Sequence, residues 1–427
     1  MGAEDPYARP GYRRYVLAVL TAGCALNFLD RQLLVILQEP IRQELGLSDT
    51  QLGLLSGFGF AGVYVVSGVL LALWSESRAR RSVIAAAMGF WSLMTAACGL
   101  AQGFGQLLLA RMGVAVGESV GGPASHSMIA DIFPPRERAF AIAVYTTGIN
   151  LGILAGYLLG GWINEYFGWR AAFLAIGLPG VLAALALRAT VQEPQRGRHD
   201  PPTLTGAPPP RLGTAIAALR EARSFRWVAL GASWQAFGLY GIGSWLPSYM
   251  MRNFGMGTGE VGTWLAATAG GVGALGTLAG GWLGDRLGRR DPRWYVWLPL
   301  AGGLLAAPFM LALLMAADAR SALLLNIVPV FVLFMYTAPV VAISHAMVGP
   351  QMRATTSAIL FAVINLLGMG AGPLFAGFIS DYFAGSLGDG SLRLAMLATL
   401  LLATAGGTVC YLRAAHLLPG DLKTRGS

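Results

Sequence analysis

The chain has 427 residues, of which 55% are hydrophobic and 12% charged, and its mean hydropathy is +0.59. A soluble globular domain carries about 25% charged residues, so this composition excludes an ordinary soluble fold. The formal net charge of +9 would suit a nucleic-acid partner, but the arginines gather in alternate loops, which is the pattern that sets membrane topology. We therefore expect a multi-pass protein of the cell inner membrane with both termini in the cytoplasm, and no nucleic acid.

About twelve apolar segments are long enough to cross a bilayer, which takes about 20 residues each. Together they use most of the chain and leave no room for a large soluble domain. The predicted fold class is an all-α membrane protein of twelve transmembrane helices. The segments are residues 15–38, 51–74, 82–102, 104–122, 139–162, 171–187, 227–249, 261–283, 294–316, 321–343, 354–378 and 394–412.

The first segment contains two full charges, Asp30 and Arg31, in an otherwise apolar run. A charge at the centre of a membrane helix costs about 2.5–3.5 kcal/mol on insertion scales. The other full charges inside the segments are Arg111 and Glu118, two helical turns apart on one face of the fourth. With the first segment running outward and the fourth inward, Asp30 and Arg111 lie at similar depth. We expect them to pair across a cavity.

These charges suit proton coupling, because a poorly solvated carboxylate changes its proton affinity when a nearby cation moves away. We predict Asp30 or Glu118 as the proton carrier and Arg111 as the switching partner. A static ion pair that only orders the helices is the alternative, although a buried pair is weak evidence for stability. Arg31 points about 100° away from Asp30, and the sequence leaves open whether it contacts an anionic substrate group or another helix.

The two halves of the chain repeat each other. Residues 135–139, before the fifth segment, match residues 350–354, before the eleventh, and Asn150 matches Asn365 at the same offset. The proline-rich stretch 191–226 lies between the halves and is typical of a linker. We predict six-helix bundles over 1–190 and 227–427, joined by this cytoplasmic linker, because duplicated halves with a site between them build several transporter folds.

Four glycines recur every fourth residue in the fifth segment: Gly148, Gly152, Gly156 and Gly160. Small residues at this spacing let membrane helices approach closely. We therefore expect tight packing along this face.

The loop between the eighth and ninth segments, Gly281-Trp282-Leu283-Gly284-Asp285-Arg286-Leu287-Gly288-Arg289-Arg290, resembles the signature loop of the major facilitator superfamily. The first half is similar, more narrowly, to the spinster family, and bacterial members above all. The stretches that carry this second resemblance are Asp30-Arg31-Gln32-Leu33-Leu34, Gly46-Leu47-Ser48-Asp49-Thr50-Gln51-Leu52-Gly53, Leu109-Ala110-Arg111-Met112-Gly113, Gly117-Glu118 and Phe133-Pro134-Pro135. The resemblance implies two bundles that rock about a central cavity, lysolipid export for animal spinster proteins, and proton coupling for bacterial relatives.

The same resemblance implies a cytoplasmic gate built from loop charges. Asp285 is expected to meet the start of the fifth helix near Arg136 and Arg138. The matching loop of the first half departs from the pattern, since Glu76 stands where an aspartate is expected. The predicted gate residues are Glu76, Arg80, Asp131, Arg136, Arg138, Asp285, Arg286 and Arg353.

The segments of the second half contain no full charge and offer aromatic and amide groups instead. Such aromatics more often pack or anchor a helix than touch substrate, but one charged bundle facing one apolar bundle suits an amphipathic molecule. The predicted substrate-cavity residues are Arg31, Asn150, Trp234, Gln235, Tyr240 and Asn365.

The sequence thus predicts a monomeric secondary active transporter that works by alternating access, is driven by protons and carries an amphipathic lipid-like or organic-anion substrate. The alternatives are a proton symporter for a small polar organic anion and, in another class, a lipid scramblase or a non-transporting receptor. An enzyme is disfavoured because the sequence has no nucleophile–base or metal-ligand constellation. We expect no metal and no cofactor.

Overall fold

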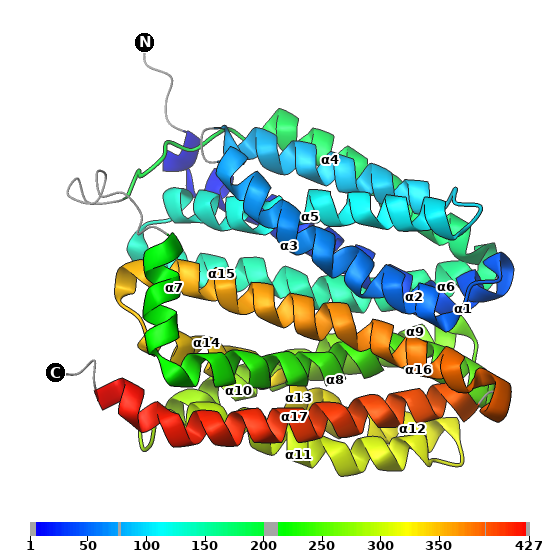
Figure 1. Cartoon of the computed structure of the whole chain (residues 1–427). Helices are drawn as coiled ribbons and strands as arrows, with labels where there is room; N and C mark the ends of the chain where they lie inside the picture. The colour runs from blue at the N-terminus through cyan, green and yellow to red at the C-terminus, as the bar shows by residue number, and fades with distance from the viewer. Residues whose placement is uncertain (1–5, 76–77, 200–211, 389, 424–427) are drawn as a thin grey trace. The chain divides into compact units, whose positions relative to one another are not determined.

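The computed structural model describes residues 6–75, 78–199, 212–388 and 390–423, and almost all of them are helical (Figure 1). The chain forms two compact units. Unit 1 comprises Met1–Gly46, Gly62–Ala207 and Thr258–Ala266. Unit 2 comprises Leu47–Ala61, Pro208–Gly257 and Ala267–Ser427. Each unit therefore includes one short piece from the other half of the sequence, and the bundle boundaries expected from the sequence stay a prediction.

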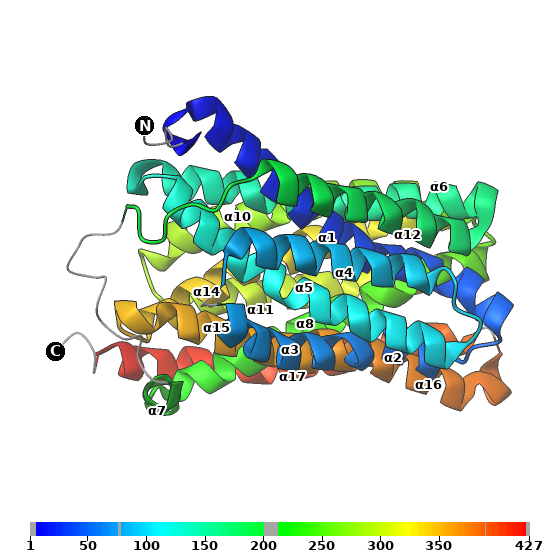
Figure 2. The ribbon, with the colours of Figure 1, turned by 90° about the horizontal axis from the view of Figure 1, so that it is seen from above.

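Unit 1 is built around the long helices α1 and α6. Its elements are η1 (Pro6–Ala8), α1 (Pro10–Leu45), most of α3 (Phe58–Ser75), α4 (Arg80–Cys98), α5 (Phe104–Ile132), α6 (Pro135–Thr190) and α9 (Thr258–Leu265). Helix α1 begins with Pro10. Proline is favourable there because the first N–H groups of a helix have no acceptor within the helix, so the absence of one removes no hydrogen bond. It ends at Leu45, and Gly46 caps it with φ 64°, a left-handed conformation that glycine adopts without strain. Figure 2 shows α4 alongside α6.

The glycine face of α6 lies directly against the backbone of α1. A Cβ atom added at Gly148 would come within 2.6 Å of the Thr21 carbonyl oxygen, and one at Gly152 within 2.3 Å of the Ala25 oxygen. Real Cβ atoms do not approach backbone so closely, so only glycine permits this packing. The tight contact predicted from the four-residue spacing is confirmed.

Helix α6 joins two of the predicted segments, 139–162 and 171–187. The chain leaves helical geometry inside it only at Gly168, with φ 81° and ψ 163°. A residue with a side chain adopts this conformation with strain. Gly168 therefore marks the bend between two membrane crossings.

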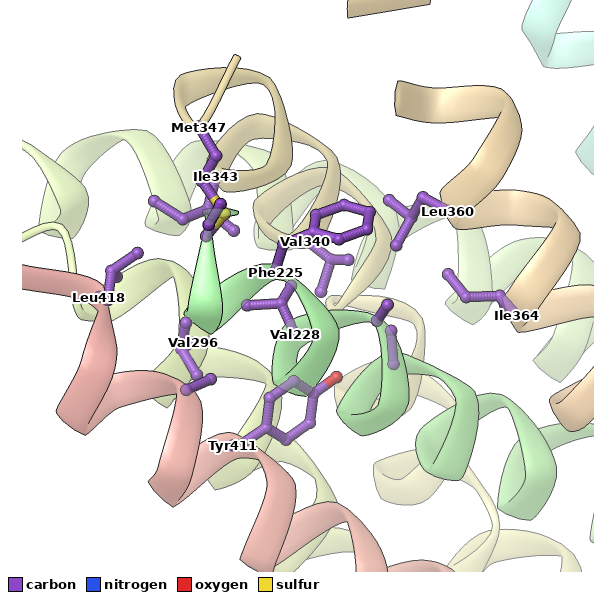
Figure 3. Packing of buried hydrophobic residues seen from close by; sticks show 14 of the residues in the cluster. Phe225, Val228, Val296, Val340, Ile343, Met347, Leu360, Ile364, Tyr411 and Leu418 are labelled. Atoms are coloured by element: carbon purple, nitrogen blue, oxygen red, sulfur yellow. The ribbon is translucent and has the colours of Figure 1, made fainter. Parts of the chain in front are cut away.

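Unit 2 contains the remaining helices and a second core. Its elements are α2 (Asp49–Ser56), α7 (Leu212–Glu221), α8 (Arg223–Phe254), η2 (Ala266–Val272), α10 (Gly273–Gly288), α11 (Trp294–Leu314), α12 (Ala319–Leu325), α13 (Ile327–Phe334), α14 (Thr337–Ala346), η3 (Pro350–Met352), α15 (Arg353–Val363), η4 (Ile364–Gly370), α16 (Ala371–Leu387) and α17 (Gly390–Lys423). Figure 3 shows side chains such as Phe225, Val296, Val340 and Leu418 meeting between α8, α11, α14 and α17.

Nine helical stretches among the described residues have the length and hydropathy of a membrane span. One of them is α6, whose 56 residues cover two crossings. Helices α5, with 29 residues, and α8, with 32, exceed the length that a crossing needs. The protein is therefore a multi-pass membrane protein, and the predicted count of twelve crossings is confirmed.

Four predicted segments contain interruptions that the sequence did not reveal. The segment 321–343 is divided among α12, α13 and α14. The segment 51–74 breaks at Gly57, where an added Cβ would lie 2.4 Å from the Gly370 carbonyl oxygen. The segments 261–283 and 354–378 each contain a π-helical turn, η2 and η4. Such turns are rare and are frequently found at functional sites.

Candidate functional site

The four intramembrane charges of unit 1 lie together on α1 and α5, and three of them are withdrawn from solvent. Asp30 and Arg111 are each 3% exposed and Glu118 is 1% exposed. Charged side chains are almost never this buried unless they are paired.

Arg31 pairs with Glu118. Its Nε lies 2.8 Å from Oε2 of the carboxylate. The guanidinium also lies over two rings, with its Cζ 5.0 Å from the centroid of Phe28 and 4.9 Å from that of Tyr64, in the arrangement of a cation–π contact. Of the two roles left open for Arg31, the structure shows a contact with another helix. Oε1 of Glu118 has no hydrogen-bond partner among the residues described.

Asp30 uses different neighbours. Oγ1 of Thr95, in α4, donates a hydrogen bond of 3.1 Å to its Oδ2. The Asp30 carboxylate is also close enough to Glu118 to be repelled by it and to Arg111 to be attracted by it. Arg111 attracts the Glu118 carboxylate as well. Two carboxylates and two guanidinium groups thus form one network that α1, α4 and α5 hold in place.

Sequence reasoning missed Thr95 because a threonine in an apolar segment has no distinctive signal by itself. The available sign was its position on the same helix face as Ser92, another hydroxyl residue that is buried in α4.

A second charged cluster surrounds Arg80, which is 4% exposed at the start of α4. Its Nη1 donates to Oδ2 of Asp131, at the end of α5, and to Oγ of Ser127 at 3.0 Å. Its Nε donates to Oε1 of Glu193 at 2.9 Å, and its Nη2 to the Pro194 carbonyl at 2.9 Å. The structure thus brings the predicted gate residues Arg80 and Asp131 together.

The chain that follows α6 is bound to the same cluster. The backbone N–H of Arg81 donates to Oε2 of Glu193 at 2.7 Å, and that of Gly197 donates to Oδ1 of Asp131 at 3.0 Å. The sequence indicated only a linker from residue 191 onward, because Glu193 and Gly197 sit in a polar, proline-rich context. The first residues of that stretch are instead an ordered part of unit 1.

The other predicted gate residues are not gathered into one cluster. Glu76 lies outside the described residues. Arg136 is exposed, and Nη2 of Arg138 donates to the Ala130 carbonyl at 2.8 Å within unit 1. Asp285, Arg286 and Arg353 are exposed and belong to unit 2. The meeting of Asp285 with the start of α6 stays a prediction.

The predicted substrate-cavity residues of unit 2 have packing contacts. Trp234 lies against Gly406 of α17, where an added Cβ would come within 2.5 Å of the indole. Tyr240 packs against the core shown in Figure 3. Gln235 is 6% exposed and accepts a hydrogen bond of 3.1 Å from the Tyr411 hydroxyl.

Two asparagines complete the predicted set. Asn150 is half-buried in α6, and Asn365 is half-buried in the π-helical turn η4. Contact of either asparagine with substrate stays a prediction. Among the described residues, no three histidine, cysteine or carboxylate side chains are grouped as metal ligands would be.

Unit 2 has a polar cluster of its own that sequence reasoning missed. Arg252, near the end of α8, donates two hydrogen bonds to Asp49, at 2.8 and 2.7 Å, and Oγ of Ser380 donates to the same carboxylate at 2.6 Å. Asp381 accepts from the backbone N–H groups of Asp49 and Thr50 at the start of α2. A carboxylate is favourable there because free N–H groups and the helix dipole meet it. Only the fold brings these distant positions together.

Comparison with known proteins agrees with this architecture. The sequence model of the family described as Major Facilitator Superfamily matches residues 20–373. The chain is 34% identical over 409 residues to an MFS-type efflux pump of Mycolicibacterium smegmatis, covering 95% of this chain and 94% of that one. It is 28% identical over 297 residues to a cis,cis-muconate transport protein of Acinetobacter baylyi, covering 68% and 71%.

A solved structure is also similar. It is that of a bacterial homolog of the human lysosomal transporter Spinster, in an inward-facing and unoccupied conformation. The TM-score is 0.89 at 30% sequence identity, with 97% of this chain and 99% of that chain covered. The resemblance read from the short motifs of the first half is therefore confirmed over nearly the full length.

Proposed function

The chain belongs to the major facilitator superfamily, and on that premise we propose that it is a proton-coupled secondary transporter for an amphipathic substrate. The observation that carries this proposal is the buried network of Asp30, Arg31, Arg111 and Glu118 in unit 1. Ionisable groups inside membrane helices are costly, and they mark ion pathways and proton relays in pumps and transporters.

The coupling follows from the balance of charge in the network. With both carboxylates ionised, the two guanidinium groups neutralise them. A carboxylate gains proton affinity when its arginine moves away. It loses proton affinity when water enters and solvates the charge. Glu118 suits the role of carrier, because one oxygen is bonded to Arg31 and the other has no partner among the described residues. Alternating access then exposes the Glu118 carboxylate to each side of the membrane in turn. Both termini of the chain lie in the cytoplasm in this proposal.

An amphipathic substrate is supported by what surrounds the network. Arg31 combines a cation with the rings of Phe28 and Tyr64, which suits a polar head joined to an apolar body. The names of two similar proteins, an MFS-type efflux pump and a homolog of the lysosomal transporter Spinster, support transport and state no substrate. The muconate transport protein favours a second candidate, a proton symporter for a small organic anion.

Purified protein in vesicles that enclose a pH-sensitive dye tests the proposal. A lysophosphatidylcholine and cis,cis-muconate serve as probes of the two substrate classes. We expect the lysolipid, and not muconate, to elicit proton movement across the membrane. Asp30→Asn and Glu118→Gln should each abolish it, whereas Glu137→Gln, which changes a carboxylate that is 55% exposed, should not.

The other outcomes are equally informative. Proton movement with muconate alone would replace the amphipathic substrate by the small anion. Lysolipid exchange that proceeds without proton movement, and is unaffected by either substitution in the network, would indicate a scramblase and overturn the proposal.

A further inference from the structure

A pocket of about 40 Å³ lies within unit 2 between α8, α11 and α17. This volume exceeds what one water molecule needs, about 10–15 Å³ on the same measure. Its walls are mainly carbon, and glycines at Gly303 and Gly407 leave room for it. A Cβ atom added at Gly303 would meet nothing within 4 Å.

The pocket reaches the surface of unit 2 beside an exposed leucine that lines it. Leu304, on its α11 side, is 48% exposed, and the next residue, Leu305, is 49% exposed. On the α17 side, Leu401 is 61% exposed next to the pocket residue Leu400. Exposed leucines on spanning helices suit contact with lipid hydrocarbon, and we therefore take the bilayer as the source of a ligand.

One polar side chain that lines the pocket, Gln235, is incompletely bonded among the described residues. Gln235 accepts a hydrogen bond from Tyr411, which reaches from α17 toward α8 (Figure 3). Nε2 of the same amide is buried and has no acceptor among the described residues. Leaving a buried donor without an acceptor is unfavourable, so a ligand that offers an acceptor is favoured over a pure hydrocarbon.

The depth of Gln235 limits the ligand further. It lies about 12 residues, or about 18 Å at the helical rise, from the start of α8 at Arg223. The hydrocarbon core is about 30 Å thick, so the amide is near its middle. Phospholipid head groups and ester carbonyls remain at the interface and do not reach this depth.

We propose that this pocket binds a neutral hydrophobic molecule that is dissolved in the bilayer core and carries a carbonyl oxygen, to which Nε2 of Gln235 donates a hydrogen bond. Chain or ring carbons of the ligand fill the space beside Gly303 and Gly407. The site is separate from the charged network of unit 1. It does not rest on the transport function proposed above.

The proposal is tested with two photoactivatable probes in phosphatidylcholine vesicles that contain the full chain. One probe is a long-chain alkyl ketone bearing a diazirine, and the other is the matching alkane. Mass spectrometry of peptides locates the labelled residues. We expect both probes to label α11 and α17 beside the pocket, with the ketone saturating at a lower concentration.

Four variants separate the parts of the site. Gly303→Leu fills the pocket and should abolish labelling there, whereas Ala301→Leu, at an exposed position of α11 outside the pocket, should not. Gln235→Leu removes the donor and should raise the ketone concentration for half-labelling by about 3- to 10-fold, the value of one hydrogen bond, without affecting the alkane. Tyr411→Phe removes the hydroxyl that donates to the Gln235 oxygen but keeps the Nε2 donor, so the ketone should still saturate at a lower concentration than the alkane.

Equal labelling of Gly303→Leu and the unchanged protein would overturn the site. An identical response of ketone and alkane to Gln235→Leu would overturn the ligand class. Glu118→Gln should label normally even where proton movement is lost, so failure of the transport proposal and failure of this one are distinguishable.

Discussion

Arg31 of α1 and Glu118 of α5 form a hydrogen-bonded ion pair of 2.8 Å in the interior of unit 1. The residue before Arg31 is also charged, yet it takes a different partner, Thr95 of α4. Because neighbours on a helix point about 100° apart, the adjacent charges of α1 reach two helices at once. One dipeptide thus fastens α1 to both α4 and α5.

Replacing Arg31 tests how much this pair contributes to stability. Arg31→Met leaves the carboxylate of Glu118 buried without its guanidinium. Breaking a buried pair in this way costs about 3–5 kcal/mol. Thermal unfolding in detergent should show a lower midpoint for Arg31→Met. The double variant Arg31→Met/Glu118→Leu should recover most of the loss, because neither member of this pair is then left buried and charged without its partner.

The matched control is Arg13→Met. Its partner Glu137 is 55% exposed at 3.5 Å, and exposed pairs contribute about 0–1 kcal/mol, so the midpoint should hardly move. A double variant no more stable than Arg31→Met would show that the unpaired charge is not the cause.

Arg80 is expected to hold the chain after α6 through the geometry of its guanidinium. Arg80→Lys keeps the charge, but an ammonium group lacks the planar fork that reaches Asp131, Glu193 and the Pro194 carbonyl together. Hydrogen exchange at the backbone N–H of Gly197, bonded to Asp131, should therefore accelerate by about tenfold or more, equal to a loss of about 1.4 kcal/mol.

Arg78→Lys serves as the comparison for Arg80→Lys. The Arg78 side chain is exposed, and its backbone oxygen, which accepts from Arg196, is kept in the variant. Unchanged exchange at Gly197 in Arg80→Lys would mean that other contacts hold this stretch.

The contact between α1 and α6 predicts opposite results for two glycines. In Gly152→Ala the new methyl group meets the Ala25 carbonyl oxygen, a backbone atom. Overpacking of this kind costs about 1–3 kcal/mol. In Gly122→Ala the methyl group meets nothing within 4 Å, and replacing a helical glycine by alanine gains about 0.5–1 kcal/mol.

Apparent melting temperatures in one detergent measure the difference. We expect Gly152→Ala to melt below the unchanged protein and Gly122→Ala at or above it. Equal melting of the two variants would contradict the close approach of α1 and α6.

The fold class and the residues of the charged network could be predicted from the sequence. A hydrocarbon core requires long apolar helices, so composition and span length determined the fold class and the twelve crossings. The unfavourable free energy of placing a charge in the hydrocarbon core identified four candidate functional residues, Asp30, Arg31, Arg111 and Glu118. The four-residue spacing of glycines in α6 predicted a contact that the structure contains.

The sequence did not determine which of the four charged residues pair with one another. Asp30 and Arg31 are neighbours in sequence, and their partners depend on where α4 and α5 lie around α1, which periodicity does not specify. The sequence placed Glu193 in a linker, whereas in the structure its carboxylate accepts a hydrogen bond from Arg80. The contact between Asp49 and Arg252 likewise joins positions that no local pattern relates.

The sequence by itself thus determined that this chain is a helical membrane protein with buried charges, because the bilayer penalises every alternative locally, residue by residue. Tertiary structure decided which charge meets which, that one donor of Gln235 has no acceptor among the described residues, and where helices bend or adopt π-helical turns. These features depend on distances between separate helices, and such distances arise only when the side chains of the whole unit pack together.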